Sequence, residues 1–178
     1  AQRAVIVYES MFGNTRRIAE AIAEGVDSVL PSLLMPIAEA HRIPSELDVL
    51  IVGGPTHAHS MSRPESRKEA VNWASSERLH LELDEAWRET GIREWLRDTP
   101  PAPCRFASFD TRVDMPRLFT GSAATAIARR LDKLGFDRLS EPMSFLVDHR
   151  SRLEPGEVER ARAWGADLAG RLTRDDAA

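Results

Sequence analysis

The sequence predicts one α/β domain in which a doubly wound, five-stranded parallel sheet carries helices on both faces. Short apolar runs rich in β-branched residues, typical of strands covered on both sides, alternate with longer segments of helical periodicity. That alternation implies right-handed crossovers between parallel strands. A chain of 178 residues with 42% hydrophobic content also suits a single core. We therefore expect one domain over residues 1–178.

Five segments carry strand patterns. Residues 4–8 form an unbroken apolar run, and residues 48–53 repeat it before a polar loop. The other predicted strands are residues 33–37, 106–109 and 143–147. Because proline cannot donate a ladder hydrogen bond, Pro36 places the second of the five strands at an edge of the sheet.

Helical periodicity fills the intervals between the strands. Ile18, Ile22 and Val26 share one face of a predicted helix, with charged residues opposite them. Ser62 followed by Pro64 resembles a helix start, which predicts a helix over residues 64–74. Further helices are predicted over residues 91–96, 124–134 and 158–172, whereas residues 75–90 have a mixed pattern and residues 110–120 are predicted to form a loop.

Charge and cysteine content narrow the function classes. A net charge of −4, from 24 basic and 28 acidic residues, argues against nucleic acid as the partner. Cys104 is the only cysteine, so no intrachain disulfide can form and a cytoplasmic, reducing environment is expected. The sequence shows neither a secretory signal nor an apolar run long enough for a membrane span, so we expect no membrane partner.

The first loop has the features of an anion site. In such sheets, ligands bind beyond the carboxyl ends of the strands, where the strand order reverses. Residues 9–15 join the first strand to a helix, so their N–H groups converge on its positive end. Ser10 and Thr15 add hydroxyl groups, Asn14 adds an amide, and Gly13 permits close backbone approach. The loop lacks a lysine and a second glycine, which excludes the Walker A and dinucleotide motifs.

Three loops together resemble a known family. Residues 8–15, Tyr-Glu-Ser-Met-Phe-Gly-Asn-Thr, resemble the phosphate loop of flavodoxins and of the flavodoxin-like domains of flavodiiron proteins. Gly-Gly-Pro-Thr-His at 53–57 resembles the second flavin loop of that family, and residues 109–121 resemble the third. The resemblance implies a flavodoxin-like sheet with strand order 2-1-3-4-5 and bound flavin mononucleotide (FMN).

The resemblance also implies roles for particular residues. The phosphate would be held by Ser10, Met11, Phe12, Gly13, Asn14 and Thr15. The isoalloxazine ring would be flanked by Pro55, Thr56, His57, Ala58, His59, Asp110, Thr111 and Arg112. Met11 and Phe12 replace the hydroxyl residues of familiar flavodoxins, which leaves backbone donors. The usual tryptophan and tyrosine around the ring are absent, so His57 is a candidate for stacking and Met115 or Leu118 for an apolar floor.

The residues favour redox chemistry over hydrolysis or metal binding. His57 and His59 lack a third ligand at convincing spacing, and Ser10 lacks the flanking glycines of a nucleophile elbow. The preferred function is FMN-dependent electron transfer with a protein or small-molecule partner, which needs no catalytic acid or base. The alternatives are an NAD(P)H or quinone oxidoreductase and a flavin-free interaction module. The protein is expected to be a monomer or a homodimer.

Overall fold

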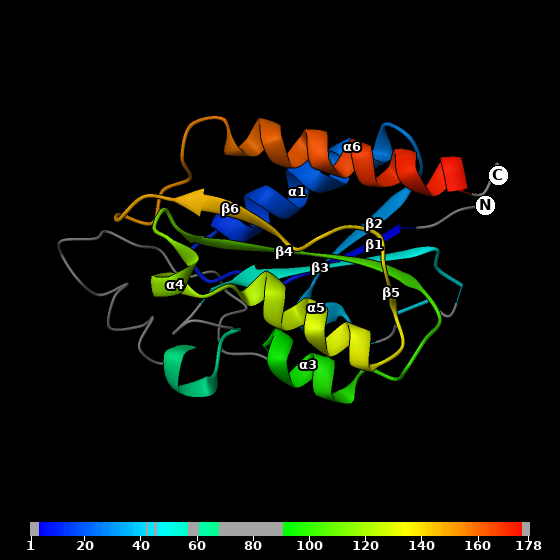
Figure 1. Ribbon diagram of the computed structural model, residues 1–178, viewed down its shortest axis with the longest axis horizontal. Helices are drawn as coiled ribbons and strands as arrows, with labels where there is room; N and C mark the ends of the chain where they lie inside the picture. The colour runs from blue at the N-terminus through cyan, green and yellow to red at the C-terminus, as the bar shows by residue number, and fades with distance from the viewer. Residues whose placement is uncertain (1–3, 42, 45, 57–60, 68–90, 176–178) are drawn as a thin grey trace.

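The computed structural model describes residues 4–41, 43–44, 46–56, 61–67 and 91–175. Its centre is a parallel sheet of six strands, in which β2, β1, β3 and β4 are neighbours in that order and both β5 and β6 pair with β4 (Figure 1). The strands are β1 (Ala4–Tyr8), β2 (Ser32–Pro36), β3 (Val49–Pro55), β4 (Arg105–Val113), β5 (Asp137–Arg138) and β6 (Met143–Val147). The predicted fold class and strand order are therefore confirmed.

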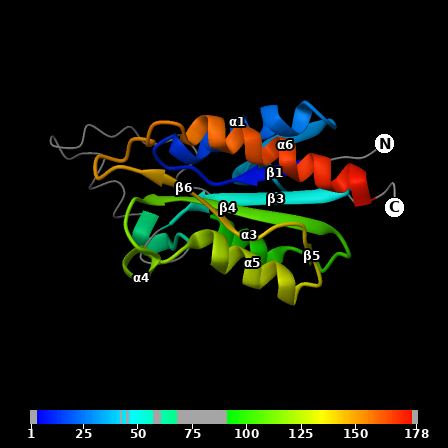
Figure 2. The same ribbon diagram turned by 45° about the horizontal axis from the view of Figure 1, so that its top comes forward.

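Helices cover both faces of the sheet, as predicted. Those of the described residues are α1 (Asn14–Asp27), α3 (Ile92–Asp98), α4 (Arg117–Thr120), α5 (Ala123–Lys133) and α6 (Glu157–Asp175), with a 3₁₀ turn η1 (Ile37–Glu39) and a helical stretch at 64–67. Figure 2 shows α1 and α6 above the sheet and α3 and α5 below it. The predicted helix over 64–74 is described only as far as residue 67.

The register aligns the carboxyl ends of the central strands. Tyr8, the last residue of β1, is opposite Pro36 of β2 on one side and Gly53 of β3 on the other. β2 lies at the edge of the sheet, as Pro36 predicts. The chain goes from β1 outward to β2 and then returns past β1 to β3. The strand order therefore reverses between β1 and β3, which is where a ligand site is expected.

The predicted fifth strand is present as β6, but a second short strand precedes it. Arg105 and Phe106 of β4 pair with Asp137 and Arg138, and pairing resumes at Phe109 with Met143. Four residues of one strand, 139–142, therefore lie opposite two of the other, 107–108. β5 and β6 behave as two halves of one interrupted strand.

β4 is longer than predicted, and the prediction of a loop beginning at Asp110 is wrong. The strand pairs with β3 as far as Thr111 and with β6 as far as Val113. The alternating charges at 110, 112 and 114 are typical of a loop in sequence. In the structure β6 extends the ladder, and the Ser122 hydroxyl and the Ala124 N–H, at the start of α5, donate to one oxygen of the Asp110 carboxylate, so a strand is stable there.

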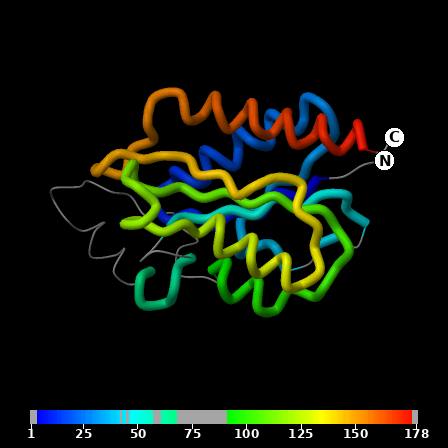
Figure 3. The backbone as a smooth tube through the Cα atoms, in the orientation of Figure 1, coloured from blue at the N-terminus to red at the C-terminus, as the bar shows by residue number. Residues whose placement is uncertain are grey.

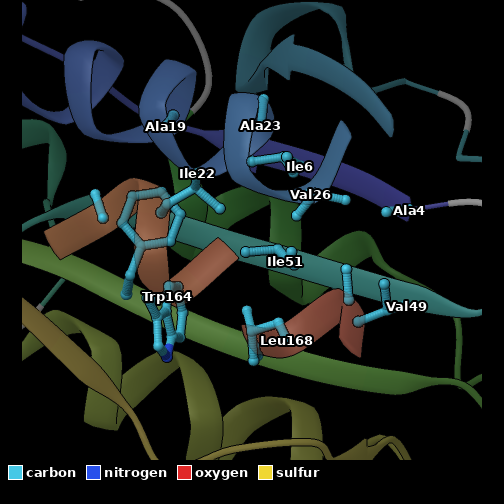
Figure 4. Packing of buried hydrophobic residues seen from close by; sticks show 14 of the residues in the cluster. Ala4, Ile6, Ala19, Ile22, Ala23, Val26, Val49, Ile51, Trp164 and Leu168 are labelled. Atoms are coloured by element: carbon cyan, nitrogen blue, oxygen red, sulfur yellow. The ribbon is translucent and has the colours of Figure 1, made fainter. Parts of the chain in front are cut away.

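The two helices on the upper face touch backbone to backbone. A Cβ atom on Gly25 would lie 1.9 Å from the Arg162 carbonyl oxygen, and one on Gly165 would lie 2.2 Å from that of Ile22. Figure 3 shows α6 running alongside α1. Beneath this contact Trp164 and Leu168 of α6 pack with Ile22 against the sheet (Figure 4).

None of the helices in the described ranges has both the length and the apolar character needed to cross a bilayer.

Cys104 is buried beside the Leu47 carbonyl oxygen. Burial, followed by the nearby charge of Asp48, raises the pKa of its thiol to about 11. A thiol with such a pKa stays protonated near neutral pH and is a poor nucleophile, which fits a structural role.

Candidate functional site

The candidate site lies where β1, β3 and β4 end, at the left of Figure 1. The segment after β1 leads into α1, β3 ends at Pro55, and β4 ends at Val113. Thr56 links the end of β3 to β4, because its N–H donates to the Thr111 carbonyl at 2.9 Å. Its hydroxyl accepts from the Ala123 N–H, at the start of α5, at 3.0 Å. Of the second predicted loop, Pro55 and Thr56 are in place here, while His57, Ala58 and His59 lie outside the described residues.

The predicted phosphate loop ends in a helix N-terminus without a side-chain cap. Gly13 is the N-cap residue of α1 and has φ 85° and ψ −12°, a left-handed conformation that side chains rarely adopt. No side chain of the described residues caps α1, and its first turn holds no acidic residue. The Gly13 N–H donates to the Ser10 hydroxyl at 3.1 Å, which closes the turn. The first N–H groups of a helix have no partner within it, so this end suits an anion.

Two polar side chains of the loop hold it against other parts of the chain. The Thr15 and Thr111 hydroxyl groups lie 2.8 Å apart in a buried contact between α1 and β4. The Asn14 amide donates to the Ser151 carbonyl at 2.5 Å, in the turn that follows β6. Thr15 and Asn14 therefore position the loop.

Met11 contributes to the loop through its backbone. Its side chain is 1% exposed, so it points into the protein, and Phe12 is half-buried. A hydroxyl at position 11 with this orientation would not face a ligand. The replacement of serine or threonine by Met11 is thus compatible with an anion site made of N–H groups.

Glu9, which the sequence reasoning passed over, is the centre of a buried network beside the loop. Its side chain follows β1 and is 6% exposed. One carboxylate oxygen accepts from the Ser62 hydroxyl at 2.5 Å, and the other accepts from the Ile92 N–H at 3.0 Å, at the start of α3. An acidic residue directly after a buried strand is the signal that was available in the sequence.

An ion pair extends this network. Arg67 donates to the Ser62 hydroxyl at 2.9 Å and to the Glu94 carboxylate at 2.8 Å. Burial raises the pKa of Glu9 more than its hydrogen bonds and Arg67 lower it. Burial acts in the same direction on Glu94, but the hydrogen bond from Arg67, the charge of Arg67 and backbone hydrogen bonds together outweigh it, and the pKa of Glu94 is lowered. The phosphate loop, the 61–67 segment and α3 are therefore joined by buried polar contacts.

The three predicted ring-flanking residues of β4 make contacts within the protein. Asp110 is fully buried, and its carboxylate accepts from the Ser122 hydroxyl at 2.6 Å and the Ala124 N–H at 2.9 Å, which caps α5. Its second oxygen has no partner among the described residues. Thr111 contacts Thr15, and the Arg112 guanidinium donates to the Met115 carbonyl at 2.6 Å. All three lie in the strand and stabilise the elements around the site.

An exposed apolar surface follows β4. Met115, Leu118 and Phe119 are 41%, 86% and 60% exposed, and they account for three of the five large hydrophobic residues that are exposed in the described part of the chain. Leu118 and Phe119 belong to α4, next to the segment that Arg112 holds. These residues provide an apolar surface at the same end of the sheet as the phosphate loop.

Solved structures share this fold. A flavodoxin from the domain Archaea has a TM-score of 0.64 and 18% identity, over 97% of this chain and 99% of that one. A WrbA-like protein from Agrobacterium tumefaciens has a TM-score of 0.57 and 18% identity, over 98% and 99% of the two chains. Rubredoxin oxygen:oxidoreductase from Desulfovibrio gigas has a TM-score of 0.61 and 18% identity, but the match covers 100% of this chain and 38% of that one.

No protein-family model matches this chain, and no curated protein matches it significantly. The likeness to solved structures is therefore one of fold. With the strand order and the helices on both faces in agreement, the chain has a flavodoxin-like fold.

Proposed function

We propose that this protein binds FMN at the carboxyl end of its sheet and transfers electrons through it. The observation that carries the proposal is the N-terminus of α1, with its left-handed glycine and without a side-chain cap, at the reversal between β1 and β3. Binding of a phosphate there would satisfy N–H groups that the described side chains leave unpaired.

The residues present fit a flavin phosphate. Gly13 exposes its backbone, and the nearest atom to a Cβ built on it is a nitrogen of the Arg16 guanidinium, at 3.6 Å. The Ser10 hydroxyl accepts from the Gly13 N–H and keeps its own proton for an anion. A single phosphate site of this kind favours FMN over FAD, because the diphosphate of FAD needs a second set of donors.

The remainder of the site fits the ring of a flavin. Pro55 ends β3 and Thr56 follows it, and Met115, Leu118 and Phe119 supply exposed apolar surface after β4. When bound, the flavin supplies the redox chemistry, and this chain holds it and sets its surroundings. The Arg112 guanidinium brings positive charge to the segment after β4. Positive charge near a reduced flavin stabilises its anionic form.

Titration of the apoprotein with FMN, riboflavin and FAD tests the assignment. We expect FMN to bind at least tenfold more tightly than riboflavin, since each charge-assisted hydrogen bond to the phosphate contributes roughly 1.5–3 kcal/mol. Equal affinities for FMN and riboflavin would refute a phosphate site at Ser10 to Thr15.

Anaerobic addition of NADH or NADPH to the FMN-loaded protein separates the two redox functions. An electron-transfer protein is expected to be reduced slowly by either nucleotide alone and rapidly by photoreduction. Bleaching of the flavin within seconds by NADH or NADPH would mean that the function of this site is an oxidoreductase activity rather than electron transfer.

A further inference from the structure

A second cavity shares none of its described lining residues with the proposed FMN site. Its volume is about 780 Å³, and it lies between residues 37–47, which connect β2 to β3, and residues 95–104, which lead from α3 to β4. This is the face of the sheet that α3 and α5 cover (Figure 2). Leu47 and Cys104 come shortly before β3 and β4, so the cavity lies toward the amino ends of these strands. The candidate functional site lies at their carboxyl ends.

The described lining of this cavity is mostly apolar. Leu50 of β3, Trp95 of α3 and Phe136 contribute buried side chains to it, and the segment 100–103, Pro-Pro-Ala-Pro, forms part of its wall. The Trp95 indole N–H donates to the Ala40 carbonyl at 2.8 Å, so its polar atom already has a partner. The cavity therefore offers a ligand apolar surface and few hydrogen bonds.

Two features keep the cavity open. The hydrogen bond from Trp95 to Ala40 joins α3 to the residues that follow η1, and residues of both segments line the cavity. The Thr99 hydroxyl donates to the Trp95 carbonyl at 2.8 Å, which fixes the end of α3. Because proline has a fixed φ, the segment 100–103 has little freedom to fold into the space. The cavity is thus formed before a ligand binds.

The charges around the cavity favour an uncharged ligand. Among the described residues that line it, none is a lysine or an arginine. Its ionisable side chains are His41 and Asp98, which are both exposed, and Cys104, whose thiol stays protonated near neutral pH because its pKa is about 11. A carboxylate or phosphate in this lining would lose its hydration without gaining a cation as a partner, which is costly.

We propose that this cavity binds an uncharged, apolar small molecule with an aromatic ring system. Small-molecule pockets have volumes of about 300–1,000 Å³, and this cavity lies in that range. Trp95 and Phe136 offer aromatic surface to a ring. Water is a poor occupant, because an apolar lining gives it few hydrogen-bond partners. The inference is independent of the proposed function, since FMN is placed at the other end of β3 and β4.

Two fluorescent probes that differ by one charged group test the chemistry of the ligand. N-phenylnaphthylamine is uncharged, and anilinonaphthalene sulfonate has the same ring system with an added sulfonate. We expect the unaltered protein to bind the uncharged probe at one site. The sulfonate should bind there at least about tenfold more weakly, because its charge would be unpaired. Absence of binding by the uncharged probe, or equal affinity for the two, would overturn the proposal.

Substitution of Ala102 tests the location. Ala102 lines the cavity and packs, half-buried, against the apolar residues beneath it. Ala102→Phe should occupy part of the space and weaken binding of N-phenylnaphthylamine by about tenfold, since a filled, close-packed region excludes a ligand. Ala163→Phe is the matched control, because it adds the same ring at an exposed position of α6, and it should leave the affinity unchanged. Equal affinities of the two variants would overturn the proposal.

Labelling of Cys104 gives a second readout that needs no variant. Cys104 lines the cavity and is the only cysteine of the chain, so N-ethylmaleimide reports on this position alone. Labelling at alkaline pH compensates for the raised pKa of the thiol. Saturating N-phenylnaphthylamine should slow the labelling several-fold in the folded protein and have no effect on the protein unfolded in urea. An unchanged labelling rate in the folded protein would mean that the probe binds elsewhere, and the proposal would be wrong.

Discussion

The Thr15 hydroxyl lies 2.8 Å from the Thr111 hydroxyl, although the two residues are 96 positions apart. This contact joins the first turn of α1 to β4 in a place where Thr15 is 2% exposed and Thr111 is 6% exposed. Because both hydroxyl groups are buried, each depends on the other for a hydrogen bond. The geometry of residues 9–15, the predicted phosphate loop, is thus coupled to β4.

Thr111→Val should destabilise the protein and weaken FMN binding. The substitution leaves the Thr15 hydroxyl without its buried partner, which costs about 1–3 kcal/mol. Urea unfolding measures the stability, and titration with FMN and riboflavin measures the site. Thr111→Ser keeps the hydroxyl and should retain most of both properties. Equal behaviour of the two variants would show that the hydroxyl contact has no role.

Gly13→Ala should remove FMN binding at a modest cost in stability. Gly13 has φ 85°, so any side chain there is strained by about 1–2 kcal/mol. The added methyl group would also occupy the space beside the Arg16 guanidinium.

Gly135→Ala is the matched control for Gly13→Ala. Gly135 also has φ 85°, and a Cβ atom on it would have no neighbour within 4 Å. Both variants should lose similar stability in urea, while FMN affinity falls only in Gly13→Ala. Loss of FMN affinity in both would mean that general destabilisation, rather than the loop, accounts for the result.

Glu9→Gln should change how stability depends on pH. Burial raises the pKa of Glu9, so the folded protein holds its proton more tightly than the unfolded chain does. The resulting stability is present below the unfolded pKa, near 4.5, and is lost as the pH rises through the folded pKa. Glutamine stays neutral throughout. Relative to the unaltered protein, Glu9→Gln should therefore be least stable in acid and gain as the pH rises from 4.5, measured by urea unfolding.

Glu157→Gln is the control of opposite sign. Burial alone would raise the pKa of Glu157, but hydrogen bonds from Arg160 and from the Leu146 N–H outweigh it, and the pKa is lowered. Its contribution is present above the unfolded pKa and is lost as the pH falls through the folded pKa. Glu157→Gln should thus be least stable, relative to the unaltered protein, at neutral pH. If the stability of both variants, relative to the unaltered protein, changed with pH in the same direction, the environment inferred for Glu9 would be contradicted.

Gly165→Ala and Gly170→Ala should have opposite effects although both lie in α6. A methyl group on Gly165 would meet the Ile22 carbonyl oxygen at 2.2 Å, so α1 and α6 must separate, at a cost of about 2–3 kcal/mol. On Gly170 the nearest atom would be the end of the Arg174 side chain at 3.4 Å, which can move. There alanine should stabilise the helix by about 0.5–1 kcal/mol. Thermal unfolding of the two variants measures both, and destabilisation by Gly170→Ala would contradict the packing described.

The sequence alone determined the order of the main elements and predicted where a candidate site lies. Continuous apolar runs predicted β1 and β3, and the spacing of apolar residues predicted α1, α5 and α6, because burial on a strand or helix face leaves a local pattern. Pro36 placed β2 at an edge, since the missing N–H is a property of the residue itself. The position of Gly13 between a buried strand and a helix indicated an anion site for the same local reason.

Only the tertiary structure decided what depends on partners far along the chain. In the sequence, Asp110 is typical of a loop. In the structure, the Ala124 N–H donates to its carboxylate and β6 pairs with β4, so β4 continues to Val113. The buried Glu9 carboxyl group has hydrogen-bond partners only because Ser62 and Ile92, 53 and 83 residues away along the chain, donate to it in the folded protein. Periodicity reports which face of an element is buried. It carries no information on which distant donor meets a buried acceptor, and that pairing is set when the layers pack.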